Sequence, residues 1–207
     1  MFAFSPQPKP NSKRIMAFFF ILLVFVTASL TVNISIVKQR SERPTPSLSP
    51  SASPLTELSL GRPARSDVVG NLGPASVVTS GEVPGEWLTD RWQAAANMAG
   101  EPLPGEHWVE IDLEKASHVE AVEVLWEKAL ARRWTAEARL SEDKPWLALA
   151  VGEKAEERVL DETHIRHWVQ ASGEGAARAR FIRILIHEPA TQWGSSIWRV
   201  RVWGRHV

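Results

Sequence analysis

The C-terminal stretch Ser195–Gly204, SSIWRVRVWG, carries the strictest pattern in the chain. Its residues alternate with period two, with Ile197, Arg199, Arg201 and Trp203 on one side and Trp198, Val200 and Val202 on the other. A second stretch, Phe181–His187, alternates as well and places three isoleucines on one side. Such alternation among β-branched and aromatic residues is typical of half-buried strands. The sequence therefore predicts two strands joined by the loop Glu188–Ser196, which contains Pro189, Trp193 and Gly194.

The folded part of the chain is predicted to be C-terminal and all-β. All ten tryptophans and all six histidines follow residue 86. Several short alternating segments in this region are separated by turns rich in Gly, Pro and Asp, which favours a β-sandwich over a helical fold. Six tryptophans on strand-like positions are expected to fill its core: Trp92, Trp108, Trp126, Trp146, Trp198 and Trp203.

An ordered set of segments carries a family resemblance. The segments are Gly105–Leu113 (GEHWVEIDL), His118–Ala129, Trp134–Trp146, Ala177–Ile186 and the terminal SSIWRVRVWG. Together they resemble the coagulation factor 5/8 type C (discoidin) family. The resemblance implies a jelly-roll β-sandwich of the galactose-binding type over residues 75–207, and a binding module in place of an enzyme.

The N-terminal third of the chain is predicted to anchor and space this domain. After a short tail, residues 1–14, the segment Ile15–Val37 holds 23 residues without a charge. As a helix it would extend about 34 Å, enough to cross a hydrocarbon core of ~30 Å. We therefore predict a transmembrane signal-anchor over 15–37; a cleaved signal peptide and an organelle transit signal stay open as alternatives.

A Pro/Ser-rich segment over 38–74 is predicted to be a disordered linker. Basic residues are balanced on the two sides of the apolar span, so they leave its orientation open. The short N-terminal tail and the stalk-like composition favour a single-pass membrane protein with its C-terminal domain in a lumen or outside the cell.

Charge and composition exclude several classes of function. Residues 66–207 hold sixteen basic and twenty-two acidic residues, a net charge of −6, which argues against a nucleic-acid partner. The chain has no cysteine, no G-x-S-x-G motif and no Gly-rich phosphate loop, so it shows no catalytic constellation. We expect no enzyme activity and no cofactor. His164 and His167 would share a face with Asp161 only in a helix, which makes DETHIRH a weak candidate for a metal site.

Carbohydrate or glycoprotein is the ligand that the sequence favours. Trp193 lies in a loop beside Gly194, where an indole can stack on a sugar ring, and Gln192 is its polar neighbour. Arg132 and Arg133 follow a strand and offer planar donors, and His107 ends a Gly/Pro-rich segment expected at one end of the sandwich. Alternatively, Trp193 caps the core and the arginines are solvated. The alternative function is an adhesion or scaffold domain that binds a protein partner or phospholipid.

One departure from the family pattern leads to a further prediction. Many members of the family hold a structural calcium ion through an acidic turn before a tryptophan and a glutamate after the C-terminal aromatic residue. Here the turn reads VPGEWLTDRW, and Arg199 follows Trp198. A guanidinium does not ligate calcium. We therefore predict that an ion pair of Arg199 with Asp90 or Glu86 replaces the metal; a solvent-exposed Arg199 is the alternative.

Overall fold

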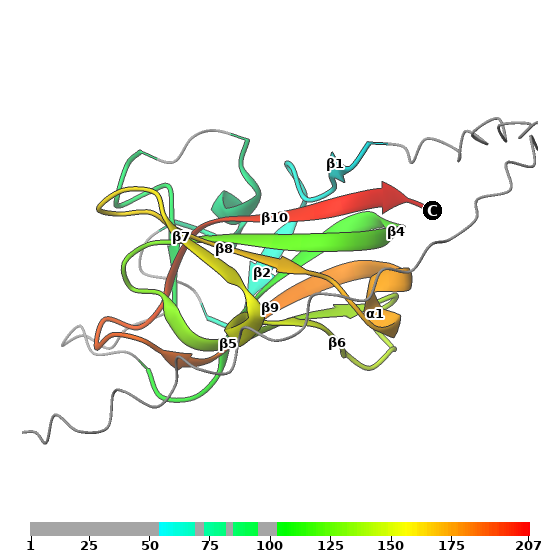
Figure 1. Cartoon of the computed structure of the whole chain (residues 1–207). Coiled ribbons are helices and arrows are strands. Elements are labelled where there is room, and N and C mark those ends of the chain that lie inside the picture. Colours follow the sequence, from blue (N-terminus) through cyan, green and yellow to red (C-terminus); the bar gives the residue numbers. More distant parts are fainter. Residues whose placement is uncertain (1–53, 69–72, 82–84, 95–102) are drawn as a thin grey trace, which may run out of the picture. The chain divides into compact units, whose positions relative to one another are not determined.

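The computed structural model describes residues 54–68, 73–81, 85–94 and 103–207. They belong to one compact unit, Ser51–Val207, and are almost wholly β (Figure 1). The elements are β1 (Thr56–Glu57), β2 (Ala64–Ser66), η1 (Ala75–Thr79), β3 (Trp92–Gln93), β4 (His107–Trp126), β5 (Ala131–Arg139), β6 (Leu147–Val151), η2 (Gly152–Lys154), β7 (Glu156–Val159), β8 (Ile165–Gln170), α1 (Glu174–Ala177), β9 (Ala179–Pro189) and β10 (Ser196–His206). The predicted all-β class is confirmed.

The predicted membrane segment Ile15–Val37 and the tail before it lie outside the described residues. Within the described ranges, none of the helices has the length and apolar character needed to cross a membrane.

The strands of the described residues form one continuous ten-stranded sheet, and the long strand β4 runs through both of the layers into which that sheet folds (Figure 1). Its first half pairs with β2 and β9, and β9 continues through β5 to β6. Its second half pairs with β10 and β8, which continue to β1 and β7. All of these pairings are antiparallel. We call them the first sheet (β2–β4–β9–β5–β6) and the second sheet (β1–β10–β4–β8–β7).

The core lies between the inner faces of the two sheets and follows the predicted alternation. The fully buried inward residues include Val109, Ile111, Val122, Val124 and Trp126 of β4, Ile182 and Ile184 of β9, and Val200 and Val202 of β10. Successive side chains of a strand point to opposite faces, so each strand buries one side and leaves the other for polar groups. Burial at ~25 cal/mol per Å² of apolar surface makes this layer the main source of stability.

The sequence analysis treated residues 105–113 and 118–129 as two separate segments. In the structure, most of both segments belong to the single strand β4. The chain turns the corner between the sheets at Asp112–Ser117, where the pairing with β9 shifts register. Glu114 has φ 63°, a left-handed conformation unusual for a residue with a side chain. Its backbone N–H donates to the Asp112 carboxylate at 2.8 Å, which stabilises the corner locally.

The border of the linker differs from the prediction. Residues 38–74 were expected to be disordered, yet β1 pairs with β10 and β2 pairs with β4. Leu58 is buried in the core, and the Ser59 side chain both donates to Val200 O and accepts from the Val202 N–H. These strands are only two and three residues long, too short for a period-two pattern to mark them.

A fragment that starts at residue 66 should therefore be less stable than one that starts at residue 54. It loses β1, the buried Leu58 and the Ser59 hydrogen bonds, which together should cost about 3–5 kcal/mol. Urea unfolding of fragments 66–207 and 54–207, followed by tryptophan emission, measures the difference. Equal unfolding midpoints would show that the N-terminal strands add nothing.

Six tryptophans were predicted to lie in the core, and the structure confirms three. Trp92, Trp126 and Trp198 are buried. Trp108 and Trp203 are half-buried, as is Trp146, whose ring lies 4.3 Å from the guanidinium carbons of both Arg139 and Arg183. The sequence placed Ile197 on the same side as Arg199, but a register shift between them puts Ile197 in the core with Val200.

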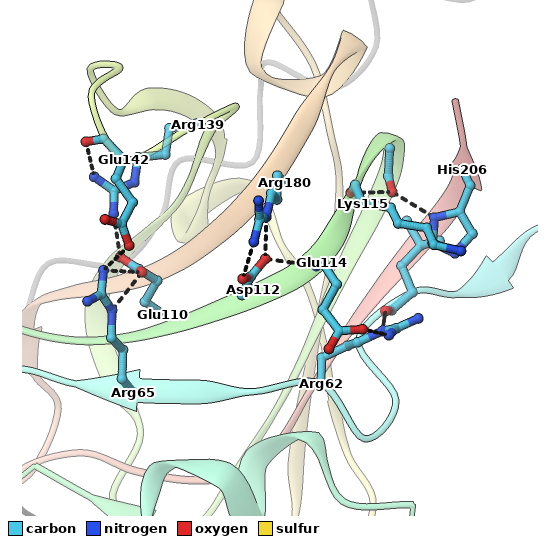
Figure 2. Close-up of polar contacts among 12 residues, drawn as sticks. Arg62, Arg65, Glu110, Asp112, Glu114, Lys115, Arg139, Glu142, Arg180 and His206 are labelled. Carbon is cyan, nitrogen blue, oxygen red and sulfur yellow. Dashed lines mark hydrogen bonds and ion pairs between the residues drawn. The ribbon is translucent and has the colours of Figure 1, made fainter.

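The outer face of the first sheet is covered by paired charges (Figure 2). The buried Glu110 carboxylate accepts hydrogen bonds from Arg65 Nε at 2.8 Å and Arg139 Nη2 at 3.2 Å. Beside it, Arg180 binds both oxygens of Asp112 at 2.8 Å (Figure 2). Arg180 is the largest cause that lowers the pKa of Asp112. Each of these carboxylates is thus paired with at least one arginine.

Candidate functional site

A cavity of about 720 Å³ opens at one end of the sandwich. It is lined by Trp87, Arg91, Gln93, Glu127, Lys128, Ala129, Thr191 and Trp193. These residues come from three separate stretches: the loop leading into β3, the β4–β5 connection and the β9–β10 connection. Its volume falls in the usual range for small-molecule sites, and a site assembled from end loops on a rigid β scaffold is a common arrangement.

Trp193 lies in the β9–β10 connection and is 60 % exposed. A tight turn presents it: Thr191 and Gly194 form a bridge, and Gly194 has φ 79°, a conformation that favours glycine. The Trp193 N–H donates to Thr191 Oγ1 at 3.2 Å, and Gln93 Nε2 donates to the Trp193 carbonyl at 2.8 Å. The backbone of Trp193 is therefore held from both sides while its ring faces solvent.

Trp87 lies in the loop before β3 and is 52 % exposed. Asp90 closes this loop, because its carboxylate accepts from the backbone N–H groups of Gly85 at 3.1 Å and Glu86 at 2.8 Å. These two hydrogen bonds, that of Glu86 first, lower the pKa of Asp90. The loop is thus stabilised by the ionised carboxylate, and this contribution is lost only as the pH falls through the lowered pKa.

Arg91 is the buried residue on which the site is built. Its side chain donates to Trp87 O at 2.7 Å and to Ser196 Oγ at 2.6 Å, and lies 4.0 Å from the Glu127 carboxylate. Its guanidinium carbon lies 3.8 Å from the centroid of the Trp87 ring, a cation–π contact. Burial lowers the pKa of Arg91, while Glu127 opposes that shift. The guanidinium of Arg91 thus packs against one face of the Trp87 ring, so both the loop and Arg91 determine how this ring is oriented.

Polar groups complete the wall of the cavity. The Glu127 carboxylate accepts from the Ala129 N–H at 2.9 Å, which orients it at the start of the β4–β5 connection. Lys128 beside it is exposed, and Thr191 and Gln93 are half-buried. The cavity therefore combines two exposed indole rings with an amide, a hydroxyl, an ammonium and a carboxylate. This combination suits a ligand with an apolar face and many hydroxyl groups.

Of the ligand-binding residues predicted from the sequence, the cavity is lined by Trp193 alone. Gln192 is exposed next to it but does not line the cavity. Arg132 and Arg133 are exposed on β5, where Arg132 pairs with Glu188 at 3.1 Å. His107 is buried at the start of β4, and its ring is hydrogen-bonded to Asp67 at 2.8 Å. These four residues are not brought together with Trp193 in one site.

The structure does not bring Arg199 to Asp90 or Glu86. Asp90 is engaged within its own loop and Glu86 is exposed. Arg199 is buried, and in the described part of the chain no ion pair or hydrogen bond is formed by its side chain. The solvent-exposed alternative is wrong too. The predicted replacement of calcium by this ion pair fails because the side chain of Arg199 turns to the outer face of the second sheet, where the nearest charges are Arg201, Glu57 and Glu123.

The segment DETHIRH forms no helix: its first three residues form a bend and only Ile165–His167 belong to β8, so its histidines separate. His164 stacks on Trp198 with ring centroids 5.0 Å apart, whereas His167 is buried and accepts from Trp134 Nε1 at 3.2 Å. Over the described residues, no three His, Cys, Asp or Glu side chains are grouped so as to hold a metal ion.

Trp87 and Arg91 are the residues that the sequence analysis missed. Both lie in VPGEWLTDRW, which was interpreted only as the counterpart of a calcium turn. A signal was present, because Trp87 comes two residues after Gly85 in a segment without strand alternation. A similar feature, a tryptophan adjacent to Gly194 in a turn, had singled out Trp193.

No protein-family model matches the chain, and no curated protein is similar to it at a significant level. Solved structures do match. The chain is similar to chitosan-binding module 1 of a chitosanase/glucanase from Paenibacillus sp. IK-5, with a TM-score of 0.53 and 21 % identity over 72 % of this chain and 99 % of that one. It is also similar to the family 32 carbohydrate-binding module of Clostridium perfringens NanJ, solved with galactose, with a TM-score of 0.53 and 15 % identity over 72 % and 99 % of the two chains.

A third similar structure is the fucolectin from striped bass, Morone saxatilis, with a TM-score of 0.52, 18 % identity and coverage of 73 % of this chain and 48 % of that one. At these identities the likeness shows the fold alone. Membership of the factor 5/8 type C family stays a prediction. Residues 54–207 have the β-sandwich fold that carbohydrate-binding modules and this lectin share.

Proposed function

We propose that the domain is a non-catalytic carbohydrate-binding module and that the cavity between Trp87 and Trp193 is its binding site. The observation that carries the proposal is the exposure of both rings, 52 % and 60 %, on one cavity of about 720 Å³. An indole packs well against the C–H face of a pyranose, and an exposed aromatic ring beside polar side chains is otherwise costly to leave in water. The fold shared with carbohydrate-binding modules supports the same ligand class.

The polar side chains would then bind the hydroxyl groups of the sugar. Glu127 accepts hydrogen bonds, Lys128 donates them, and Thr191 and Gln93 can contribute on the opposite stretches of the wall. Arg91 acts as a positioning residue, because its guanidinium is buried beneath Trp87 and already engaged with the backbone and Ser196.

The predicted tether extends this proposal. If Ile15–Val37 anchors the chain, the module is displayed on a membrane surface by the residues that precede β1, with the glycan of a glycoprotein or polysaccharide as its partner. Fractionation of tagged full-length chain tests the tether: resistance to carbonate extraction supports it, and recovery in the soluble fraction with a shortened N-terminus contradicts it.

Replacement of Trp193 or Trp87 by alanine should reduce sugar affinity by about 10–100-fold, since loss of a central aromatic contact costs about 1.4–3 kcal/mol of binding free energy. Calorimetric titration of fragment 54–207 with galactose and with chitosan oligosaccharides measures the affinity. Leu88→Ala is the matched control, because Leu88 neighbours Trp87 and is 62 % exposed but does not line the cavity.

Two outcomes would contradict the proposal. The first is unchanged affinity in both tryptophan variants. The second is absence of sugar binding together with binding to phospholipid vesicles that Leu88→Ala abolishes, which would assign these exposed apolar side chains to a membrane surface.

A further inference from the structure

The outer face of the second sheet differs from that of the first sheet in its hydrogen-bonding groups. On the first sheet, each arginine of the network meets a carboxylate, and Arg139 Nε is the one buried arginine nitrogen among the described residues of this sheet without a hydrogen-bond partner (Figure 2). On the second sheet, several buried donor atoms have no hydrogen-bond partner within the described residues: Arg166 Nε, Arg199 Nε, Arg199 Nη2, Arg201 Nε and Trp203 Nε1. All of these atoms are donors. A group that satisfies them must therefore supply acceptors.

Arg199 is the most demanding of these side chains. It is 6 % exposed, and two of its nitrogen atoms are buried without a hydrogen-bond acceptor in the part of the chain described. A buried donor left without an acceptor costs about 1–3 kcal/mol, and more when it is charged, so native structures rarely keep one without a reason. Burial is the main cause that lowers the pKa of Arg199, and the positive charge of Arg201 lowers it further.

The strand register places a second arginine on the same row. Arg199 of β10 lies opposite Leu125 of β4, which lies opposite Arg166 of β8. Directly opposite residues point to the same face of a sheet, so Arg199 and Arg166 flank Leu125, with backbones roughly 10 Å apart by the usual strand spacing. In the described residues neither arginine has an ion-pair or hydrogen-bond partner.

Two carboxylates on this face, Glu123 and Glu57, are engaged by Arg201. A third, Glu156 of β7, is exposed on the neighbouring row. Arg201 pairs with Glu123 at 3.2 Å and with Glu57 at 3.7 Å, so both acids are shared with a neighbour of Arg199. Arg158 continues the row on β7, opposite Arg166, and is exposed. The row therefore carries three arginines and no acid, and it ends on β7, the strand at the edge of the second sheet.

We propose that Arg199 and Arg166 form an oxyanion-binding site on the outer face of the second sheet, separate from the cavity of Trp87 and Trp193. Its ligand is a carboxylate, sulfate or phosphate group, which offers only acceptors and matches the planar donor fork of arginine. This group is either a free inorganic oxyanion or the acidic substituent of a larger molecule.

Thermal unfolding of fragment 54–207 with millimolar sodium sulfate, against sodium chloride at the same ionic strength, tests the site. Binding to the native state alone should raise Tm by about 3–6 °C at a sulfate concentration tenfold above Kd. Sulfate also stabilises proteins by exclusion from their surface, so variants serve as the reference. Arg199→Met keeps an unbranched apolar side chain and removes the donors, and it should abolish the sulfate-specific rise.

Arg166→Met is the second variant, because Arg166 is half-buried and its replacement is a smaller risk to folding. Arg132→Met, on the first sheet and exposed, is the matched control and should keep the full rise in Tm.

A second arm of the experiment compares a sulfated monosaccharide with its unsulfated parent in the Trp193→Ala background. A rise with inorganic sulfate identifies a free oxyanion as sufficient, and a rise with the sulfated sugar alone identifies an acidic substituent.

The proposal is overturned if sulfate and the sulfated sugar raise Tm no more than chloride does. It is equally overturned if the rise persists in both arginine variants. Because the second arm is measured without Trp193, failure of the carbohydrate cavity does not affect the result.

Discussion

Replacement of Gly204 by alanine should destabilise the domain by about 3 kcal/mol or more, a large part of a typical stability of 5–15 kcal/mol. Gly204 lies in β10 between β1 and β4. A Cβ atom at this position would lie 2.0 Å from the carbonyl oxygen of His118 and 3.0 Å from Leu58 Cδ1. The carbonyl belongs to the backbone of β4, so no rotamer change relieves the overlap. The two central strands of the second sheet must separate.

Urea unfolding of Gly204→Ala and Gly85→Ala measures this effect against a control. A Cβ at Gly85 meets no atom within 4 Å, so that variant should unfold like the wild type. Similar midpoints for both variants would mean that β10 and β4 separate without cost at this point.

Replacement of Trp126 by alanine should cost about 3–5 kcal/mol, the usual range for removal of a buried large aromatic side chain. Trp126 is fully buried at the end of β4, and its ring meets Trp134 edge-on with centroids 5.8 Å apart. The ring of His167, on the neighbouring strand β8, has its centroid 6.1 Å from that of Trp126. The cavity left behind would be lined by these two rings, which cannot collapse into it without leaving their own partners.

Trp126→Phe is the informative comparison in the same unfolding experiment. Trp126 Nε1 is buried without a hydrogen-bond partner in the described structure, so phenylalanine removes an unsatisfied donor while it keeps most of the ring. We expect a loss less than half that of Trp126→Ala. An equal loss of unfolding free energy in both variants would contradict this expectation, because it would show that the phenyl ring recovers none of the packing of the indole.

The strands were predictable from the sequence wherever one face is buried along a regular ladder. β9 and β10 show this, because Ile182, Ile184, Val200 and Val202 repeat every second residue and all face the core. The pattern failed where the ladder is irregular. Register shifts next to Ile197 and at the corner after Asp112 change which face a residue occupies, and composition carries no trace of them.

The site was predictable only in part, because it is assembled from distant segments. Trp193 could be recognised from its own local turn. The role of Trp87 in the site, in contrast, depends on Arg91, which packs against its ring, and on Glu127, which lies 4.0 Å from Arg91. That arrangement exists only once three loops meet. Arg199 illustrates the same limit: its departure from a family pattern was visible, but its surroundings are set by β1 and β4, which no local pattern places beside it.

The position of β10 has a consequence for how the domain is made. β10 pairs with β1, β3 and β4, and the hydrogen bond from Thr56 to Gly204 spans 148 positions along the chain. At a synthesis rate of about 5–20 residues per second, β1 leaves the ribosome on the order of 10–30 s before its partner does. From the time β4 emerges until β10 follows it, the apolar inner face of β4 has no complete second sheet to cover it. The nascent domain should therefore be a client of chaperones that shield exposed strands until β10 closes the layer.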